Sequence, residues 1–317
     1  MVKALLSGNE AIARGAYESG VLLAAAYPGT PSTEILENVA QYEEIIAEWA
    51  PNEKVALDVA IGGAYAGART MAVMKHVGLN VAADAFFYAS MTGTEGGLVI
   101  VSADDPAMHS SQNEQDNRRY AQFARVPCLE PSDSQEAKDL VGVALEISER
   151  FDTPVLLRTT TRIAHSHTMV ELGERQAVPR EEPFDYRVDR AKYVMVPGNA
   201  RRRHPVVEER VGQLAEFAET FAYNRVEMAN PSLGIITDGV AYQYAKEVFP
   251  EVSFLRLGMV YPLPEGLIRE FAAQVERLIV VEELDPFIEE QIRLRGIPVE
   301  GKRIFPITDE FDPTVVR

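Results

Sequence analysis

The sequence predicts an α/β protein in which a parallel β-sheet, covered by helices on both faces, is followed by a smaller α/β unit. Short apolar runs of strand length alternate with amphipathic helical patterns along most of the chain, and this alternation is typical of a parallel sheet. At 317 residues the chain is too long for one ordinary domain and fits two. Its composition, with 46% hydrophobic and 25% charged residues, is that of a globular protein.

The first half of the chain has the clearer alternation. Residues 21–26 are apolar and too few for a helix, so they predict a buried strand. Within residues 31–47, apolar side chains recur at Ile35, Val39 and Ile46, which is the period of an amphipathic helix. Applied in order, these criteria predict a helix at 11–19, a strand at 21–27, helices at 31–47 and 53–69, a strand at 71–75, a helix at 80–92, a strand at 98–103, a polar loop at 104–116 leading into a helix that ends at 123, a strand at 126–130, a helix at 134–150 and a strand at 154–159.

The composition changes between residues 165 and 204. Charged residues and prolines dominate there and no long apolar period survives, so the crossing between two domains is predicted in this segment. We therefore expect one domain at 1–165, a linker at 166–204 and a second domain at 205–317. The second domain is expected to contain a helix at 206–223, a strand at 233–237, a helix at 240–248, a strand at 253–257, a helix at 265–273, a strand at 278–282, a helix at 286–295 and a last short strand at 303–306.

Charge excludes two classes of partner. Lysine plus arginine total 31 and aspartate plus glutamate 48, so the net charge of −17 favours neither nucleic acid nor an anionic membrane surface. The one basic cluster, residues 201–204, is interpreted as a surface patch or a salt-bridge site. No apolar run approaches the roughly 18 residues needed to span a bilayer, and residues 1–12 lack the apolar core of a signal peptide. We expect a cytoplasmic protein.

Cys128 is the only cysteine. It cannot form an internal disulfide, and it cannot by itself hold an iron–sulfur cluster or a structural zinc. Because it lies in an apolar, strand-like run, we interpret it as a buried, inert thiol. If the protein catalyses a redox reaction, the electron carriers are therefore on another chain.

The turn at residues 27–34 is the strongest candidate for a binding loop. It connects the strand at 21–26 to a helix, with Thr30 suited to the N-cap, Pro31 to the first helical position and Glu34 to the first turn. A polar turn at the carboxyl end of a strand is where open α/β sheets bind ligands. The alternative is a well-capped connection with no ligand.

The helix predicted at 53–69 contains three glycines, Gly62, Gly63 and Gly67. Each costs about 1 kcal/mol relative to alanine, so we expect close approach by a second backbone or by a ligand. Asp58 lies one turn before Gly62, and its apolar neighbours favour its burial. The alternative for Asp58 is the ordinary solvated aspartate of a helix surface.

Two more polar segments follow predicted strands. In residues 74–80, Lys75 and His76 either bind an anion or cap the next helix. Residues 102–117 form a polar run without lysine that is longer than a short connection needs, and His109 there is either a pocket residue or a surface histidine.

Four common phosphate-binding and catalytic motifs are absent from the sequence. It contains no Walker-type phosphate loop, no strand followed by G-x-G-x-x-G, no G-x-S-x-G and no H-E-x-x-H. His165 and His167 have neither a cysteine nor another histidine nearby, so no metal site is predicted.

Six runs of this sequence resemble the α subunit of indolepyruvate:ferredoxin oxidoreductase, within the thiamine-diphosphate 2-oxoacid:ferredoxin oxidoreductases. The resemblance extends over almost the whole chain, through residues 8–16, 26–32, 52–57, 74–84, 109–116 and 193–201. It implies that the first domain is the pyrimidine-binding domain of a thiamine enzyme, a doubly wound parallel sheet. The second domain would then be transketolase-C-like.

The resemblance also implies an activity. The expected reaction is the oxidative decarboxylation of an arylpyruvate or indolepyruvate type of 2-oxoacid to an acyl-coenzyme A, with electrons passing through iron–sulfur clusters to ferredoxin. The cofactor would be thiamine diphosphate with Mg²⁺, which supplies the carbanion chemistry while the protein orients and polarises it. One alternative is a non-catalytic assembly or regulatory subunit of the same fold. Another is a thiamine ligase or decarboxylase built on the same two domains.

In the family a glutamate on the glycine-rich helix hydrogen-bonds the aminopyrimidine, and the matching position is interpreted as Asp58. Aspartate is one methylene shorter, so its carboxylate falls about 1.5 Å short, and misplacement by about 1 Å can cost on the order of a hundredfold in rate. By resemblance, Thr30 and His109 are expected to contact the substrate. The residues expected to contact the cofactor are Pro28, Gly29, Thr30, Asp58, His76 and Gly78.

The family's diphosphate-binding domain, with its Mg²⁺ motif, and its Cys-rich ferredoxin-like segment are not found in this sequence. We expect them on another chain or in a missing segment, so that the chain alone does not catalyse. The resemblance further implies a smaller β (γ-type) subunit, ferredoxin and coenzyme A as partners. The glycine-faced helix favours contact between two α chains.

Overall fold

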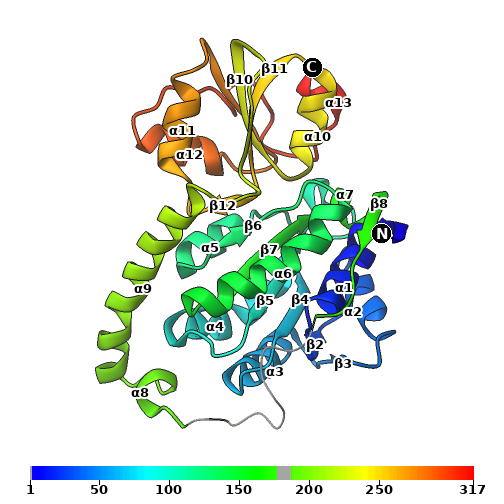
Figure 1. The fold of residues 1–317 in the computed structure, drawn as a ribbon, viewed down its shortest axis with the longest axis vertical. Coiled ribbons are helices and arrows are strands. Elements are labelled where there is room, and N and C mark those ends of the chain that lie inside the picture. The colour runs from blue at the N-terminus through cyan, green and yellow to red at the C-terminus, as the bar shows by residue number, and fades with distance from the viewer. Residues whose placement is uncertain (1, 177–185, 187) are drawn as a thin grey trace.

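The computed structural model describes residues 2–176, 186 and 188–317. The chain folds into a large sheet with helices on both faces and a smaller α/β unit on one edge of that sheet (Figure 1). The predicted α/β fold with a parallel sheet is therefore confirmed. The elements of the first part are β1 (Val2–Ser7), α1 (Gly8–Glu18), β2 (Leu23–Ala26), α2 (Thr33–Val39), β3 (Ile46–Trp49), α3 (Glu53–Tyr65), β4 (Thr70–Lys75), α4 (His76–Thr92), β5 (Leu98–Asp104), α5 (Arg118–Ala124), β6 (Cys128–Leu129), α6 (Ser134–Phe151), β7 (Val155–Thr160), α7 (Thr161–His165) and β8 (His167–Leu172).

The large sheet has the strand order β12-β6-β7-β5-β4-β2-β3 in the described residues. All neighbouring strands are parallel except β12 (Met259–Tyr261), which is antiparallel to β6. Helices α3, α4 and α5 bury Leu57, Phe86 and Ala121 against one face. On the other face, α1, α2 and α6 bury Ile12 and Leu36 among their core residues. Burial on both faces explains why the central strands are continuous apolar runs.

The predicted helix at 31–47 is too long. Helix α2 ends at Val39, and Ile46–Trp49 forms the edge strand β3, whose first amide donates to the Leu22 carbonyl at 2.9 Å. Ile45 is buried in a turn while Ile46 is 65% exposed, so the apparent helical period arose from a turn followed by an edge strand. Three of the four residues of β3 are exposed, as expected for an edge strand that has solvent on one side.

The segment predicted as a linker carries more structure than its composition indicates. Within it, β8 pairs antiparallel with β1, which brings residues near 170 beside the N-terminus. The chain continues through α8 (Arg190–Tyr193) and α9 (Pro197–Ala218), and α9 lies along the side of the first unit (Figure 1). Residues 177–185 and 187 of the predicted linker, with Pro179 and Pro183, lie outside the described residues.

The smaller unit contains a sheet with the order β13-β10-β11-β9 in the described residues, in which only β9 is antiparallel to its neighbour. Strand β12 leaves this unit and joins the large sheet, so the two units share main-chain hydrogen bonds. The elements are β9 (Arg225–Glu227), β10 (Asn230–Asp238), α10 (Gly239–Val248), β11 (Val252–Leu257), β12, α11 (Glu265–Ala272), β13 (Leu278–Val281), α12 (Phe287–Leu294) and α13 (Pro313–Val316).

The strand predicted at 303–306 is wrong. The segment forms turns, in which the Ile304 amide donates to the Gly301 carbonyl at 2.8 Å. Phe305 is buried and anchors this turn in the core of the smaller unit, whereas Ile304 is 47% exposed. The strand was predicted because two apolar residues, Ile304 and Phe305, stand together in this turn.

At some positions glycine allows two elements to pack closely, whereas at others the space beside the glycine is open. Gly15 of α1 packs on α6 so closely that an added Cβ would overlap the carbonyl oxygen of Lys138. In the glycine-rich helix, Gly63 has a close neighbour, since a Cβ there would lie 2.7 Å from Thr70 Cγ2, but this neighbour is a side chain and not the expected second backbone or ligand. A Cβ at Gly62 would meet no atom within 4 Å, and Gly67 lies beyond the end of α3.

This difference predicts opposite effects for two alanine substitutions. Gly15→Ala is expected to lower the free energy of unfolding by about 1–3 kcal/mol, because α1 and α6 must move apart. Gly62→Ala is expected to raise it by about 0.5–1 kcal/mol, because alanine favours the helix and meets no neighbour. Urea unfolding of both variants and the parent chain measures the difference. Equal destabilisation would contradict the packing described here.

Candidate active site at the carboxyl edge of the large sheet

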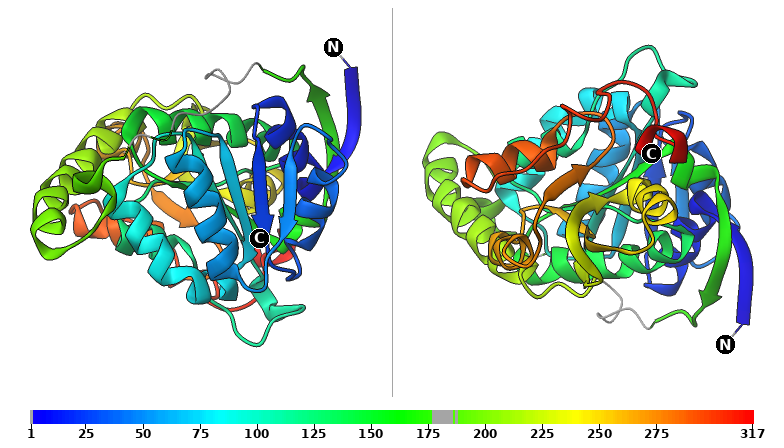
Figure 2. Two further views of the ribbon diagram at one scale, coloured as in Figure 1. Left: turned by 90° about the horizontal axis from the view of Figure 1, so that it is seen from below. Right: turned by 90° about the horizontal axis from the view of Figure 1, so that it is seen from above.

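The carboxyl ends of β2, β4, β5 and β7 lie along one edge of the large sheet because these strands are parallel. Polar loops follow each strand, and ligands of open α/β sheets bind at this edge. The segments 27–34, 74–80 and 102–117, together with the N-terminus of α3, therefore lie at the same end of the sheet. The smaller unit covers part of this end (Figures 1 and 2).

The loop after β2 is held by its own polar groups. The Gly29 amide donates to Thr33 Oγ1 at 2.8 Å, and Ser32 Oγ donates to the Gly29 carbonyl at 2.8 Å. The prediction that Thr30 caps the helix and Pro31 opens it is wrong, because α2 begins at Thr33 with Ser32 at the N-cap. Thr30 is instead exposed, and its hydroxyl makes no hydrogen bond within the described part of the chain.

Lys75 connects this loop to the neighbouring strand. As the last residue of β4, it donates from Nζ to the Ser110 carbonyl at 3.0 Å, and Ser110 Oγ donates to the Thr30 carbonyl at 3.3 Å. The side chain of Lys75 passes over Gly29, where an added Cβ would lie 3.0 Å from Lys75 Cδ. Partial burial lowers the pKa of the Lys75 ammonium, and the charge of Asp105 opposes that effect.

Asp105 orders the long loop after β5. Its Oδ2 accepts from the Ser110 amide at 2.9 Å and from Ser111 Oγ at 2.6 Å, and its Oδ1 accepts from Thr161 Oγ1 at 2.8 Å. Partial burial raises the pKa of Asp105, but these hydrogen bonds outweigh it and the net shift is downward. The carboxylate thus holds the loop against the end of β7.

His109 lies at the contact between the two units. Its Nε2 is 3.4 Å from Glu310 Oε1, and Arg162 pairs with the same carboxylate. The imidazole is half-exposed. The substrate contact expected of His109 stays a prediction.

His76 is completely buried at the start of α4, which begins four residues before the predicted helix. Its Nε2 lies 3.1 Å from the Asn113 carbonyl oxygen, and its own carbonyl accepts from Gln115 Nε2 and Asn117 Nδ2. Within the described residues Nδ1 has no hydrogen-bond partner. His76 therefore attaches the long loop to β4 and α4, and one ring nitrogen remains available.

Asp58 lies on the outer surface of α3. Its side chain is 49% exposed, and Lys54 Nζ donates to its Oδ2 at 2.9 Å. The expected burial of Asp58 is wrong, because Leu57 and Ile61 occupy the faces of the helix that pack into the core. Asp58 also lies five residues beyond the first residue of α3, about 7.5 Å further along the helix from the carboxyl edge.

Glu53 is the candidate that sequence reasoning missed. It is the first residue of α3, at the carboxyl edge, and it is only 9% exposed. Within the described residues its carboxylate makes no hydrogen bond or ion pair. Gly78 faces it closely, since a Cβ at Gly78 would lie 2.6 Å from Glu53 Cγ and 2.7 Å from Oε1. The sequence contained the signal, because Glu53 is a glutamate within the run 52–57 that carries the resemblance.

A buried network of charges joins the carboxyl edges of the two sheets. Arg118, at the start of α5, pairs with Asp116 at 2.5 Å, with Asp238 at 2.7 Å and with Glu282 at 2.8 Å. Asp238 ends β10 and Glu282 follows β13, so one guanidinium bridges both units. Burial raises the pKa of Asp116, but Arg118 and Arg158 outweigh it and hold this pKa at about 2.

Carboxylates outnumber arginines in this network. Arg158 of β7 donates from Nε to Asp104 at 2.7 Å and also pairs with Glu130. Burial raises the pKa of Glu282 to about 7, although the charge of Arg118 acts in the opposite direction. Nearby, burial raises the pKa of the Cys128 thiol well above its usual value, which agrees with the prediction of an inert cysteine.

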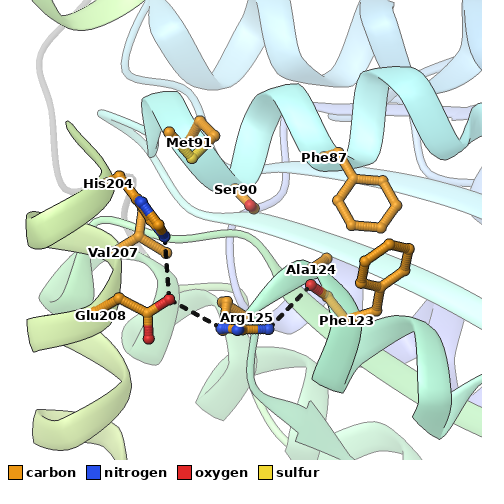
Figure 3. A pocket seen from close by; sticks show the side chains of 9 residues that line it. All are labelled: Phe87, Ser90, Met91, Phe123, Ala124, Arg125, His204, Val207 and Glu208. Carbon is orange, nitrogen blue, oxygen red and sulfur yellow. Dashed lines mark hydrogen bonds and ion pairs between the residues drawn. The ribbon is translucent and has the colours of Figure 1, made fainter. Parts of the chain in front are cut away.

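An apolar pocket of about 350 Å³ lies between α4, α5 and α9 (Figure 3). Phe87 and Phe123 meet edge to face in it, with ring centroids 4.6 Å apart. Arg125 and His204 both contact Glu208 at its rim. The pocket is lined by the C-terminal parts of α4 and α5, so it is separate from the carboxyl edge, where both helices begin.

No helix in the described residues is long and apolar enough to cross a membrane.

The fold defines an α/β protein of two units, in which polar loops at the strand ends of the large sheet lie next to the smaller unit. The chain belongs to the family described as pyruvate flavodoxin/ferredoxin oxidoreductase, thiamine diphosphate-binding, whose model matches residues 14–230. The resemblance found in the sequence is therefore confirmed.

Relatives of known sequence agree with this assignment. The indolepyruvate oxidoreductase subunit IorA of Archaeoglobus fulgidus is 43% identical over 95% of this chain and 50% of its own length. Its counterpart in Methanothermobacter marburgensis is 46% identical over 90% of this chain and 48% of its own length. This chain thus spans about half the length of these relatives. The 2-oxoglutarate synthase subunit KorA of Methanothermobacter thermautotrophicus is 27% identical over 87% of this chain and 86% of its own length.

A solved structure supports the same fold. The 2-oxoglutarate:ferredoxin oxidoreductase from Magnetococcus marinus, bound to 2-oxoglutarate, coenzyme A and succinyl-coenzyme A, superposes with a TM-score of 0.79 at 18% identity. The match covers 99% of this chain and 64% of that one.

Proposed function

We propose that this chain is part of a thiamine-diphosphate-dependent 2-oxoacid:ferredoxin oxidoreductase of the arylpyruvate or indolepyruvate type. The observation that carries the proposal is the buried carboxylate of Glu53 at the carboxyl edge, which has no partner among the described residues, in a chain of a thiamine-diphosphate-binding family. The names of the relatives at 43–46% identity support the arylpyruvate type.

The polar groups at this edge of the sheet fit the aminopyrimidine end of the cofactor. Glu53 offers a carboxylate within a largely buried site, and Gly78 leaves it room. When bound, thiamine diphosphate supplies the carbanion chemistry of the reaction. The part of Glu53 is to accept a hydrogen bond from the ring nitrogen of the aminopyrimidine and to polarise it. His76 offers a ring nitrogen at the same edge, and Pro28 and Gly29 shape the loop beside it.

Glu53, and not Asp58, is proposed as the activating carboxylate. Both lie on α3, but Glu53 is buried at the carboxyl edge whereas Asp58 is exposed and paired with Lys54. Glu53 also has the side-chain length that the family uses. The idea of a non-catalytic subunit depended on an aspartate in place of that glutamate, so Glu53 removes its basis.

The remaining parts of the enzyme are proposed to lie outside this chain, which covers about half of its IorA relatives. They are the diphosphate-binding part with Mg²⁺, the iron–sulfur clusters and a smaller β (γ-type) subunit. Ferredoxin and coenzyme A are the proposed electron acceptor and acyl acceptor. Contact between two α chains and a cytoplasmic location complete the proposal.

Reconstitution tests this function. The chain, combined with its diphosphate-binding and iron–sulfur partners, is expected to reduce a viologen dye when indolepyruvate or phenylpyruvate, coenzyme A and thiamine diphosphate are all present. Omission of any one of the three is the control. A reconstituted complex that binds thiamine diphosphate but reduces no dye with any 2-oxoacid would contradict the proposal.

A further inference from the structure

Lys75 is a cation at the carboxyl edge that has no carboxylate partner within the described residues. Its ammonium group has three donors, and only one is used, in the 3.0 Å hydrogen bond to the Ser110 carbonyl. In a chain with a net charge of −17, most cations have acidic partners, so an unpaired lysine between two loops calls for an explanation.

The other cations near the edge are already neutralised. Arg118 contacts three carboxylates, Arg158 pairs with Asp104 and Glu130, and Arg162 pairs with Glu310. Among the lysines, Lys3, Lys54, Lys138, Lys192 and Lys246 each form an ion pair. Lys302 forms none, but its Nζ donates to two carbonyls of the smaller unit. Of the cations compared here, Lys75 therefore has the most unused capacity to bind an anion.

Contacts place Lys75 beside Thr30. Its stem runs over Gly29, and Ser110 accepts from Lys75 through its carbonyl while donating to the Thr30 carbonyl through its hydroxyl. The hydroxyl of Thr30, in the loop after β2, and the two spare donors of Lys75, at the end of β4, thus lie at neighbouring strand ends. A donor pair of this kind suits a carboxylate, because each of its two oxygens accepts a hydrogen bond.

We propose that Lys75 binds the carboxylate of the 2-oxoacid substrate, with Thr30 as the neighbouring donor. The proposal rests on the proposed function. It makes Lys75 a determinant of specificity for 2-oxoacids over neutral carbonyl compounds. Partial burial strengthens such a pair, since it reduces screening by water.

The charge pair is expected to act on binding more than on turnover. An interaction with the carboxylate is made with the bound substrate and weakens when that group leaves, so it stabilises the ground state at least as much as the transition state. Removing it should raise KM and leave kcat little changed.

A titration without turnover tests the binding directly. The lysines of the full chain are dimethylated with ¹³C, the Lys75 signal is assigned with Lys75→Arg, and the chain is titrated with phenylpyruvate and then with its uncharged methyl ester. We expect a saturable shift of the Lys75 signal with phenylpyruvate only, while the exposed Lys3 signal stays in place. A Lys75 signal that moves no more than that of Lys3, or equally with the ester, would overturn the proposal.

Kinetics of the reconstituted complex give a second test. Lys75→Gln is expected to raise KM for phenylpyruvate about 10- to 100-fold, while Lys75→Arg retains most of the affinity and Lys3→Gln behaves as the parent. The methyl ester has no free carboxylate to release as carbon dioxide, so it serves as an inhibitor, and its inhibition constant is expected to be the same for Lys75→Gln and the parent. An unchanged KM for phenylpyruvate in an active Lys75→Gln complex would contradict the role of Lys75 but not the proposed function. A parent complex that reduces no dye with 2-oxoacids would contradict the proposed function. In that case the titration still decides whether Lys75 binds the carboxylate.

Discussion

Replacing Glu53 by glutamine is expected to lower the 2-oxoacid-dependent rate of dye reduction by the reconstituted complex about 10²- to 10⁴-fold. Glutamine keeps the size of the side chain but carries no charge, so it cannot polarise the aminopyrimidine or share its proton. The measurement is kcat at saturating cofactor. Thermal unfolding of the variant should match the parent, which separates lost activation from lost folding.

Asp58→Asn is the matched control for this prediction. Asp58 lies on the same helix, but its ion pair with Lys54 is exposed to solvent and screened by water. The Asp58 variant should therefore retain activity. The reverse pattern, with an active Glu53→Gln complex and an inactive Asp58→Ala complex, would return the activating role to Asp58.

Arg118→Met is expected to lower the free energy of unfolding by about 3–5 kcal/mol. The substitution leaves the carboxylates of Asp116, Asp238 and Glu282 buried without their common partner. Two of these belong to the smaller unit, so the attachment of that unit should weaken first. Denaturant unfolding measures the total loss, and hydrogen exchange in β10 and β13 measures the local one.

Arg119→Ala provides the comparison at the adjacent position. Arg119 also pairs with two carboxylates, Asp285 and Glu290, but it is 36% exposed. Its loss should cost about 0–1 kcal/mol. If Arg118→Met costs no more than Arg119→Ala, the buried network does not hold the units together.

Local sequence patterns were sufficient to predict most of the helices and strands of the fold. The central strands were recognised because they are buried on both faces and therefore apolar along their length, as at residues 98–103. Strand β3 was missed because an edge strand has no such run. Strands β1 and β8 pair across about 165 positions of the chain, and no local pattern reports such a contact.

The sequence predicted the location of the candidate site, at the polar segments that follow the strands, better than the burial of its individual side chains. The polar segments after β2, β4 and β5 were recognised from their composition, and parallel strands bring them to one edge. The expected burial of Asp58 was wrong, because spacing along α3 relates Asp58 to Gly62 but does not say which end of the helix lies at that edge. The burial of Glu53 against Gly78 at that edge is the observation on which its proposed role rests.

The sequence by itself determined the α/β class, the family and the loops that form the site, because alternation and motif content are properties of neighbouring residues. Only the tertiary structure decided which carboxylate is buried, which lysine lacks a carboxylate partner in the described part of the chain, and which arginine joins the two units. Burial and pairing depend on groups far apart in the chain, as in Arg118 and Glu282, which are 164 residues apart and in direct contact.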